Sequence, residues 1–304
     1  MRYYGLLLTA TVLMATGFVA SKLFLNAGIH PLALVVSRFS LAGLLALIWL
    51  YFRGQLQVPR TRRDLFGVVV VGTLQTAVLF GTGFMAMAHL SAATISILTL
   101  TMPIWVTVFE GLIARQPPGR GQILSLVMGM AGVTLIIGSG VGPEGSPHAL
   151  WYGLTLLGAC SWAAATVFTK RGGLGVTGWS LNGWQMLIGG LQIQLLMFVL
   201  DVPVTELPHD RNMLLFVWLV IPASILSFGC WFGALRLGGA EAASGYLFLI
   251  PLFTALMSVP ILHATFTVTQ LLGAAAVAVA VWRMSRVDRR GANPGDDHTV
   301  RDSR

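Results

Sequence analysis

One stretch of this chain occurs twice, and the repeat constrains the fold more than any other feature. Residues 84–103 recur 148 positions later as residues 232–251, and the same offset also relates positions well outside this stretch. The matched pairs include Tyr4 with Tyr152, Lys22 with Lys170, Ser96 with Ser244, Pro103 with Pro251 and Gln122 with Gln270. Apolar composition does not produce Tyr, Lys, Pro and Gln pairs at one constant spacing. The pattern therefore indicates two copies of one structural unit.

The composition places both copies in a membrane. Hydrophobic residues make up 56% of the chain and charged residues 10%, whereas a soluble domain has about 25% charged residues. The two cysteines, Cys160 and Cys230, lie inside apolar runs without metal or redox spacing, which is typical of packing residues. Phosphate-binding glycine loops, nucleophile elbows and zinc motifs are absent from the sequence. We therefore expect no catalytic residues, no metal and no cofactor.

Ten segments are long and apolar enough to cross a bilayer, which takes about 20 residues in a helix. They are residues 4–25, 31–52, 65–88, 91–113, 121–140, 149–169, 179–200, 213–235, 240–262 and 267–284. The first segment resembles a signal peptide, but its repeat copy lies in mid-chain, so we interpret it as a helix. The sequence predicts two five-helix repeats, 1–142 and 149–287, followed by a disordered cytoplasmic tail, 288–304.

The basic residues predict the orientation. Sixteen of the 19 Lys and Arg residues fall on one side of the predicted spans, Lys22 and Arg211 fall on the other, and Arg38 lies inside a span. Such a bias places both termini in the cytoplasm, here of a cell (inner) membrane. It also explains the net charge of +8 without a nucleic-acid partner. Because each repeat has an odd number of spans, the repeats are inverted, as in many transporters. The predicted fold is thus an all-α membrane protein with ten transmembrane helices in two inverted five-helix repeats.

Arg38 is the sharpest functional signal. It lies roughly 10 Å into the second predicted span at 1.5 Å per residue, where a charged side chain is costly and usually faces protein or a water-filled cavity. Its repeat counterpart, with a one-residue slip, is Gln185, so the two side chains are expected to flank one central space. A guanidinium there suits a carboxylate or phosphate. The alternatives are that Arg38 snorkels outward or ties helices together through backbone carbonyls.

Other polar and aromatic residues inside the predicted spans are candidates for the cavity wall. Aromatic side chains with polar groups do not suit a lipid-facing position in mid-membrane. The expected substrate-binding residues besides Arg38 and Gln185 are Phe84, Trp105, Trp162, Trp184, Tyr246 and Gln75. Pro103 and Pro251, at matched positions, free the carbonyls of Thr99 and Leu247. These prolines are interpreted either as packing kinks or as kinks that shape and gate the site.

Carboxylates are rare in the predicted spans. Only Glu110 and Glu241 lie within or at the ends of spans, both toward the predicted cytoplasmic side. A proton-coupled transporter usually needs a titrating group in its path. Glu241, however, is expected at a helix N-terminus, where the helix dipole stabilises a carboxylate. The sequence therefore does not support proton coupling.

Two matched stretches carry a family resemblance: residues 84–88 running through Ala92-Ala93 to Pro103, and residues 232–235 running through residues 240–242 to Pro251. In these stretches the chain resembles the EamA-type members of the drug/metabolite transporter superfamily. It covers about residues 4–284. One departure is that the Gly-Glu-Arg often found after helices four and nine is replaced by residues 114–116 and 263–265. Any gating role of that Glu is therefore not carried over to this chain.

The resemblance implies a secondary carrier that exports or exchanges small metabolites, often amino acids, by alternating access without ATP. The expected partners are a small-molecule substrate and the lipid bilayer, and the expected state is a monomer. An exporter of cationic drugs is the nearest alternative, although it would favour a membrane carboxylate over Arg38. A membrane enzyme would need clustered catalytic groups, and a non-transporting scaffold would need an interaction domain; neither feature is present in the sequence.

Overall fold

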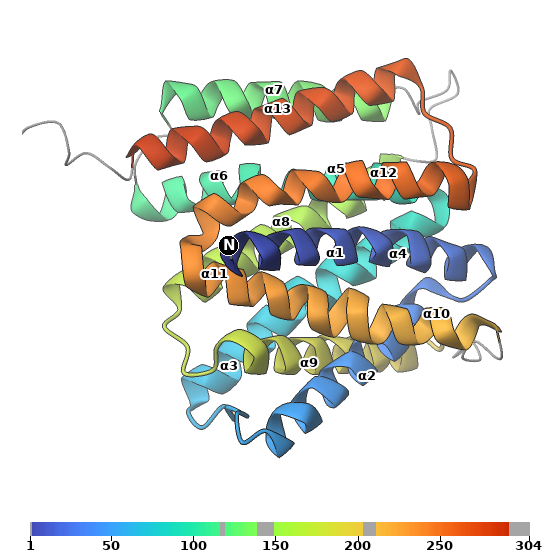
Figure 1. The fold of residues 1–304 in the computed structure, drawn as a ribbon, viewed down its shortest axis with the longest axis vertical. Helices are drawn as coiled ribbons and strands as arrows, with labels where there is room; N and C mark the ends of the chain where they lie inside the picture. Colours follow the sequence, from blue (N-terminus) through green and yellow to red (C-terminus); the bar gives the residue numbers. More distant parts are fainter. Residues whose placement is uncertain (1, 116–118, 139–148, 203–210, 292–304) are drawn as a thin grey trace, which may run out of the picture.

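The computed structural model describes residues 2–115, 119–138, 149–202 and 211–291, and this part of the chain folds into helices without a strand (Figure 1). The first half comprises α1 (Arg2–Asn26), α2 (Pro31–Phe52), α3 (Arg62–Val71), the π-helix η1 (Gly72–Val78), α4 (Leu79–His89), α5 (Ala92–Thr99), α6 (Met102–Ala114) and α7 (Arg120–Gly138). The second half comprises α8 (Ala149–Arg171), α9 (Gly178–Val199), α10 (Arg211–Val220), the π-helix η2 (Ile221–Leu226), α11 (Ser227–Ser244), the 3-10 helix η3 (Gly245–Phe248), α12 (Leu249–Leu262) and α13 (Val268–Gly291).

These elements group into the ten predicted spans, since α3–η1–α4, α5–α6, α10–η2–α11 and η3–α12 each form one continuous or broken rod. Within the described residues, six helices are long and apolar enough to cross a membrane, and α7, α12 and α13 contain shorter apolar helices. The remaining predicted span, α9, has 22 residues and carries several amide side chains. Large apolar side chains are exposed on the outer faces of the bundle, as in Phe52 (81%), Phe198 (82%) and Leu214 (80%). A surface of this kind suits lipid and not water.

Two predicted boundaries in the second half are wrong. We expected a loop between residues 235 and 240, but α11 continues to Ser244. In the first half, the Ser91 hydroxyl accepts a hydrogen bond from the Thr94 N–H and starts α5. The equivalent residue of the second half is Gly239, which has no side chain to cap a new helix, and the Ala-Glu-Ala-Ala that follows favours helix. Glu241 therefore lies near the end of α11 and not at a helix N-terminus.

The helix contacts repeat between the halves. Helix α2 packs against its counterpart α9, and α7 packs against its counterpart α13 along one edge of the bundle (Figure 1). The contacts of α1 with α11 and α12 correspond to those of α8 with α4 and with α5 and α6. Exchanging the halves thus returns these main helix contacts, as expected for a pseudo-two-fold relation. The two inverted five-helix repeats of the predicted fold are confirmed.

Glycines allow the two self-paired seams to close. A Cβ on Gly43 of α2 would lie 2.4 Å from the backbone nitrogen of Leu187 in α9. A Cβ on Gly132 of α7 would lie 2.7 Å from the carbonyl oxygen of Gly273 in α13. Both distances are shorter than real Cβ contacts, so any larger residue would push the helices apart. Small residues of this kind are typical of close helix packing in membranes.

Polar contacts join neighbouring chain segments near the ends of the helices. The start of α1 and the end of α13 lie at the same end (Figure 1). At one end the segment after α8 meets the start of α3 and the segment before it. The Gly175 N–H donates to Asp64 Oδ1 at 2.8 Å, and the Thr177 N–H donates to Gln57 Oε1 at 2.8 Å. At another site, Lys22 Nζ donates to the Met87 carbonyl at 2.6 Å and ties α1 to the end of α4.

The first residues of the predicted tail, 288–291, belong to a helix. Helix α13 continues to Gly291, past the predicted tail start at residue 288. The remainder of the predicted tail, residues 292–304, and the predicted repeat boundary at residue 142 lie outside the described residues.

Candidate substrate-binding site

Arg38 joins the two halves at the centre of the molecule. Its side chain is buried, with only 3% exposed, so it does not snorkel to the surface. Nε donates to Ser224 Oγ at 2.7 Å, and Nη2 donates to the Ala223 carbonyl at 3.0 Å. Nη1 donates to Ser21 Oγ at 3.1 Å. The predicted alternative that Arg38 ties helices together is therefore realised, through both hydroxyl groups and a backbone carbonyl.

Aromatic rings surround the same guanidinium. The Arg38 Cζ lies 4.7 Å from the Phe39 ring centroid, 5.8 Å from that of Phe80 and 5.9 Å from that of Phe84. Phe80 also contacts Phe228 edge-on, with 5.9 Å between centroids. Ring faces attract a cation, and such contacts gain strength where water is excluded. They stabilise the guanidinium without neutralising its charge.

The charge of Arg38 has no acidic partner in the described part of the chain. Its three hydrogen-bond acceptors are neutral, and the ion pairs among the described residues involve only Glu110. A guanidinium has five N–H groups, so one N–H on each Nη is not used by these three bonds. Buried charges are usually paired. The site thus offers an uncompensated cation with donors to spare.

A cavity lies beside this guanidinium, between the halves. Its empty volume, which includes space open to solvent, is about 720 Å³. The first half contributes residues of α1, α2, α4 and α5, and the second half contributes residues of α8, η2, α11, η3 and α12. The lining is apolar and aromatic apart from Arg38, Ser96 and Thr99. Aromatic members are Phe18, Phe80, Phe84, Trp162 and Phe228.

The π-helices position the polar contacts of both halves. Ser224 lies in η2, where the wide turn lets its hydroxyl donate to the Leu219 carbonyl at 2.7 Å. Thr76 is the repeat counterpart of Ser224 and lies in η1. The Thr76 hydroxyl donates to Gln185 Oε1 of α9. Each half therefore joins a polar side chain of its second span to the π-helix of the other half. Such π segments are frequent at functional sites.

The two prolines follow breaks in their spans, and both breaks border the cavity. Pro103 lies in the first turn of α6. Just before it, the Thr101 N–H donates to the Leu98 carbonyl at 3.1 Å, a shorter turn than the α-helix provides. Pro251 lies in the first turn of α12, just after η3. Thr99 and Leu100 line the cavity at the first break, and Leu247 and Ile250 line it at the second. The prolines thus shape the cavity wall without facing it themselves.

The structure brings together only some of the predicted substrate-binding residues. Arg38, Phe84 and Trp162 line the cavity. Gln185 does not share this space with Arg38 as expected, because the inverted symmetry places it against Thr76, and its Nε2 donates to Asn182 Oδ1 at 3.3 Å. The expectation that these two side chains flank one central space is wrong.

The other candidates lie away from the described cavity lining. Trp184 Nε1 donates to the Gln57 carbonyl at 2.9 Å, in the segment before α3. The Tyr246 ring packs against Tyr4, with 6.0 Å between centroids. Gln75 is buried in η1, and its Nε2 has no partner among the described residues. The buried Nε1 of Trp105 is likewise without a partner in the described part of the chain.

Sequence reasoning missed several residues of the site. Ser21 and Ser224 hold the guanidinium, and Phe80 stacks near it. Gly17 leaves room for it, since a Cβ there would lie 3.1 Å from Arg38 Nη2. A usable signal was the four-residue spacing of Phe80 and Phe84, which places both rings on one face of a helix.

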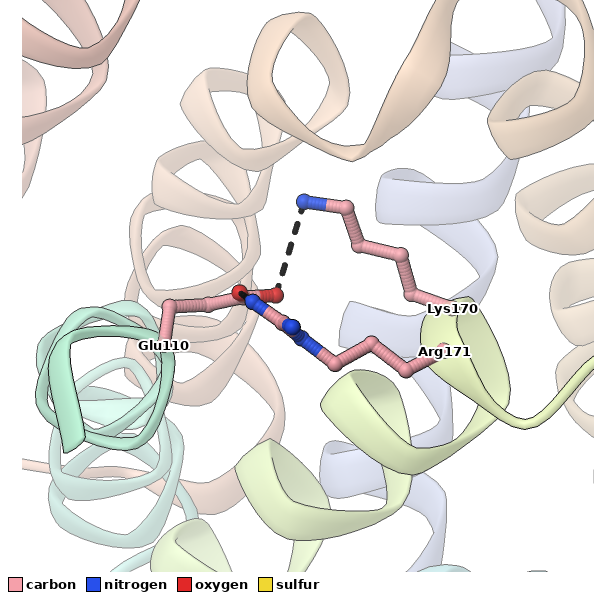
Figure 2. Close-up of polar contacts among 3 residues, drawn as sticks. All are labelled: Glu110, Lys170 and Arg171. Carbon is pink, nitrogen blue, oxygen red and sulfur yellow. Dashed lines mark hydrogen bonds and ion pairs between the residues drawn. The ribbon is translucent and has the colours of Figure 1, made fainter. Parts of the chain in front are cut away.

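Figure 2 shows a second charged cluster, formed by Glu110, Lys170 and Arg171. These three residues are not part of the described cavity lining. Glu110, near the end of α6, lies between Lys170 and Arg171 at the end of α8. Its Oε1 is 3.5 Å from Lys170 Nζ, and Arg171 Nε donates to its Oε2 at 3.1 Å. Arg171 Nη2 contacts the same oxygen. The cluster therefore joins the first half to the second at the ends of these helices.

Comparison with known proteins explains this architecture. A model of the EamA-like transporter family matches residues 1–138 and again residues 149–286. The chain belongs to the EamA-like transporter family. This EamA-like chain is a multi-pass membrane transporter of small solutes and not an enzyme, as the sequence predicted.

Two curated proteins and one solved structure are similar to this chain over most of its length. The EamA-like chain is 28% identical over 211 residues to Protein PecM of Dickeya dadantii (strain 3937), which covers 69% of this chain and 70% of that protein. It is 25% identical over 254 residues to the Uncharacterized inner membrane transporter YedA of Escherichia coli (strain K12), covering 83% of this chain and 80% of that protein. A solved crystal structure matches with a TM-score of 0.69 at 18% identity, covering 97% of this chain and 100% of that one. The last comparison shows the fold alone.

Proposed function

We propose that this protein is a secondary transporter that carries small organic solutes, amino acids or related metabolites among them, through the cavity by alternating access. One observation carries the proposal: the cavity lies between the inverted halves, and beside it Arg38 of the first half donates a hydrogen bond to Ser224 of the second. In inverted-repeat transporters, substrates bind near the midplane between the repeats, which then rock around the site.

In this proposal the two moving units are residues 1–142 and 149–287, and the protein resides in the cell (inner) membrane with both termini in the cytoplasm. The end that holds Glu110, Lys170 and Arg171 then faces the cytoplasm, in agreement with the bias of basic residues. The described residues offer no free carboxylate at the cavity lining for a cationic drug. That observation favours metabolite transport over the export of cationic drugs.

A cavity-filling variant tests the proposal. Gly83 of α4 lines the cavity, and a Cβ there would meet no atom within 4 Å. Gly83→Phe should therefore fill the cavity without a clash of its first side-chain atom. Gly153 of α8 is exposed and also open around its Cβ, so Gly153→Phe is the matched control.

The measurement is counterflow of radiolabelled amino acids and organic acids into proteoliposomes. We expect accumulation with the parent protein and with Gly153→Phe, and none with a folded Gly83→Phe. Equal accumulation by both variants would show that solutes do not pass through this cavity. Absence of counterflow for every solute with the parent protein would contradict transport itself.

A further inference from the structure

We propose that the cavity selects solutes with a single carboxylate and an apolar body, and that it rejects solutes that also carry an ammonium group. This inference rests on the proposed function and narrows its substrate class: of the solutes proposed there, it keeps the organic acids and removes the amino acids. It follows from the charges, donors and surfaces that face the cavity.

The single charge at the described lining is the guanidinium of Arg38. Neutral groups hold it in place, so its charge remains for a ligand to neutralise. One unused N–H on each Nη can reach a carboxylate, whose two oxygens match the guanidinium fork. Because only one cation is present, a monoanion balances it, whereas a dianionic phosphate would leave one buried charge uncompensated.

An ammonium group finds no carboxylate among the described residues that line the cavity. The polar lining residues other than Arg38 are Ser96 and Thr99, which are neutral. The Ser96 hydroxyl already donates to the Ala93 carbonyl at 2.7 Å. A zwitterionic amino acid would therefore lose the hydration of its ammonium without gaining a carboxylate partner, and it would bring a second cation close to Arg38.

The remaining wall suits an apolar body, particularly a flat one. Phe80 and Phe84 lie next to the guanidinium and line the cavity with Trp162 and Phe228. Rings at edge-on angles, such as Phe80 with Phe84 at 85°, present both faces and edges to a ligand. Burial of apolar surface then supplies affinity, while Arg38 selects the charge.

The experiment uses three ligands with one body: 3-phenylpropanoate, phenylalanine and 3-phenylpropylamine. An aliphatic acid, 4-methylpentanoate, tests a second body. Binding to the full-length protein in nanodiscs is measured by calorimetry and by thermal stabilisation, since a ligand of the folded state raises stability. We expect the affinity for 3-phenylpropanoate to be at least about tenfold higher than the affinity for phenylalanine. We expect no binding of the amine.

Two variants test whether the selectivity comes from Arg38 and from the cavity. Arg38→Gln should lower affinity for 3-phenylpropanoate about tenfold or more while the amine remains unbound. Because that variant can fail to fold, Gly83→Phe fills the cavity and leaves Arg38 in place, and it should abolish binding of both acids. Gly153→Phe should bind as the parent does. Tight binding of phenylalanine or the amine, or no binding of either acid to the parent, would overturn the inference.

Proteoliposome transport of the same ligands separates this inference from the proposed function. The protonated, uncharged forms of the acids can cross lipid without a carrier. Uptake into liposomes that contain Gly83→Phe is therefore subtracted from the measured transport. Transport of phenylalanine or the amine through the cavity, without the acids, would leave the transporter assignment intact and overturn the selectivity. Binding of the acids without transport of any solute would support the selectivity and contradict the proposed function.

Discussion

The ion pair at Glu110 is expected to hold the halves together at the proposed cytoplasmic end. Glu110 in α6 contacts Lys170 and Arg171 in α8 (Figure 2). In the proposed rocking motion, opening of this end separates α6 from α8, because these helices belong to different halves and pack together. Glu110→Gln keeps the size of the side chain and removes its charge. It should therefore favour the state that is open at this end.

The structure sets the magnitude. The Glu110 side chain is 23% exposed, Lys170 is 54% exposed and Arg171 is 44% exposed, so solvent screens the cluster. Exposed pairs contribute about 0.2–1 kcal/mol each. With two partners, the loss is about 1 kcal/mol, which changes the ratio of the two states about fivefold.

A cysteine in the cavity reports the opening. Ser96 lines the cavity, and Ser96→Cys is studied after Cys160 and Cys230 have been replaced by serine. The rate of its reaction with a hydrophilic maleimide, added from the proposed cytoplasmic side of sealed vesicles, should rise about fivefold in Glu110→Gln. Arg120→Gln removes an exposed charge at the start of α7 and serves as the control.

A double-mutant cycle tests whether the effect belongs to the ion pair. Arg171→Gln should raise the reaction rate as well. In the double variant with Glu110→Gln, the rate should be only slightly higher than in the faster single variant, because both substitutions remove the same interaction. Unchanged rates in the single variants would refute the reasoning, as would effects that simply add. An equal rise in Arg120→Gln would show that net charge at this end, and not the pair, controls opening.

Three further predictions concern the contacts that hold the fold. Gly43→Ala should lower stability by about 1–3 kcal/mol in chemical unfolding, because its Cβ would overlap the backbone of α9; Gly5→Ala, where the Cβ meets nothing within 4 Å, should change little, and equal effects would contradict the packing argument. Ser224→Ala removes the acceptor of Arg38 Nε and should lower the affinity for a carboxylate severalfold while the helical circular dichroism spectrum stays that of the parent. Lys22→Met removes two hydrogen bonds to carbonyls at the end of α4 and should lower the melting temperature; a conserved melting temperature would show that water satisfies these carbonyls equally well.

The general fold could be predicted from the sequence because the repeat and the length of the apolar runs act locally. Each span must satisfy its backbone internally in lipid, so apolar length alone indicates a helix. The boundary near Gly239 could not be predicted in the same way, since a helix continues where no local group stops it, and the Gly238-Gly239 pair fits either a loop or a continuing helix. The π-helices likewise leave no distinct mark on apolar spacing, although they place Thr76 and Ser224.

The candidate site was predictable only in part. A charged residue inside a span is informative alone, which is why Arg38 could be selected before its surroundings were known. Its partners Ser21 and Ser224 are 17 and 186 positions away along the chain, and no local pattern links them. Trp184 and Tyr246 were selected for residue type and depth, yet type and depth do not show which face of a helix looks into the cavity.

Arg38 and Gln185 occupy matched positions in the two repeats, but only Arg38 is among the described residues that line the cavity. Arg38 meets Ser224 in η2, and Gln185 meets Thr76 in η1, so the two contacts are equivalent under exchange of the halves. The amide of Gln185 and the hydroxyl of Thr76 satisfy each other as neutral groups. A guanidinium cannot be neutralised by a hydroxyl, so at the equivalent position Arg38 retains its charge beside the cavity. One contact is therefore complete within the protein, and the other leaves a charge for the proposed carboxylate ligand to balance.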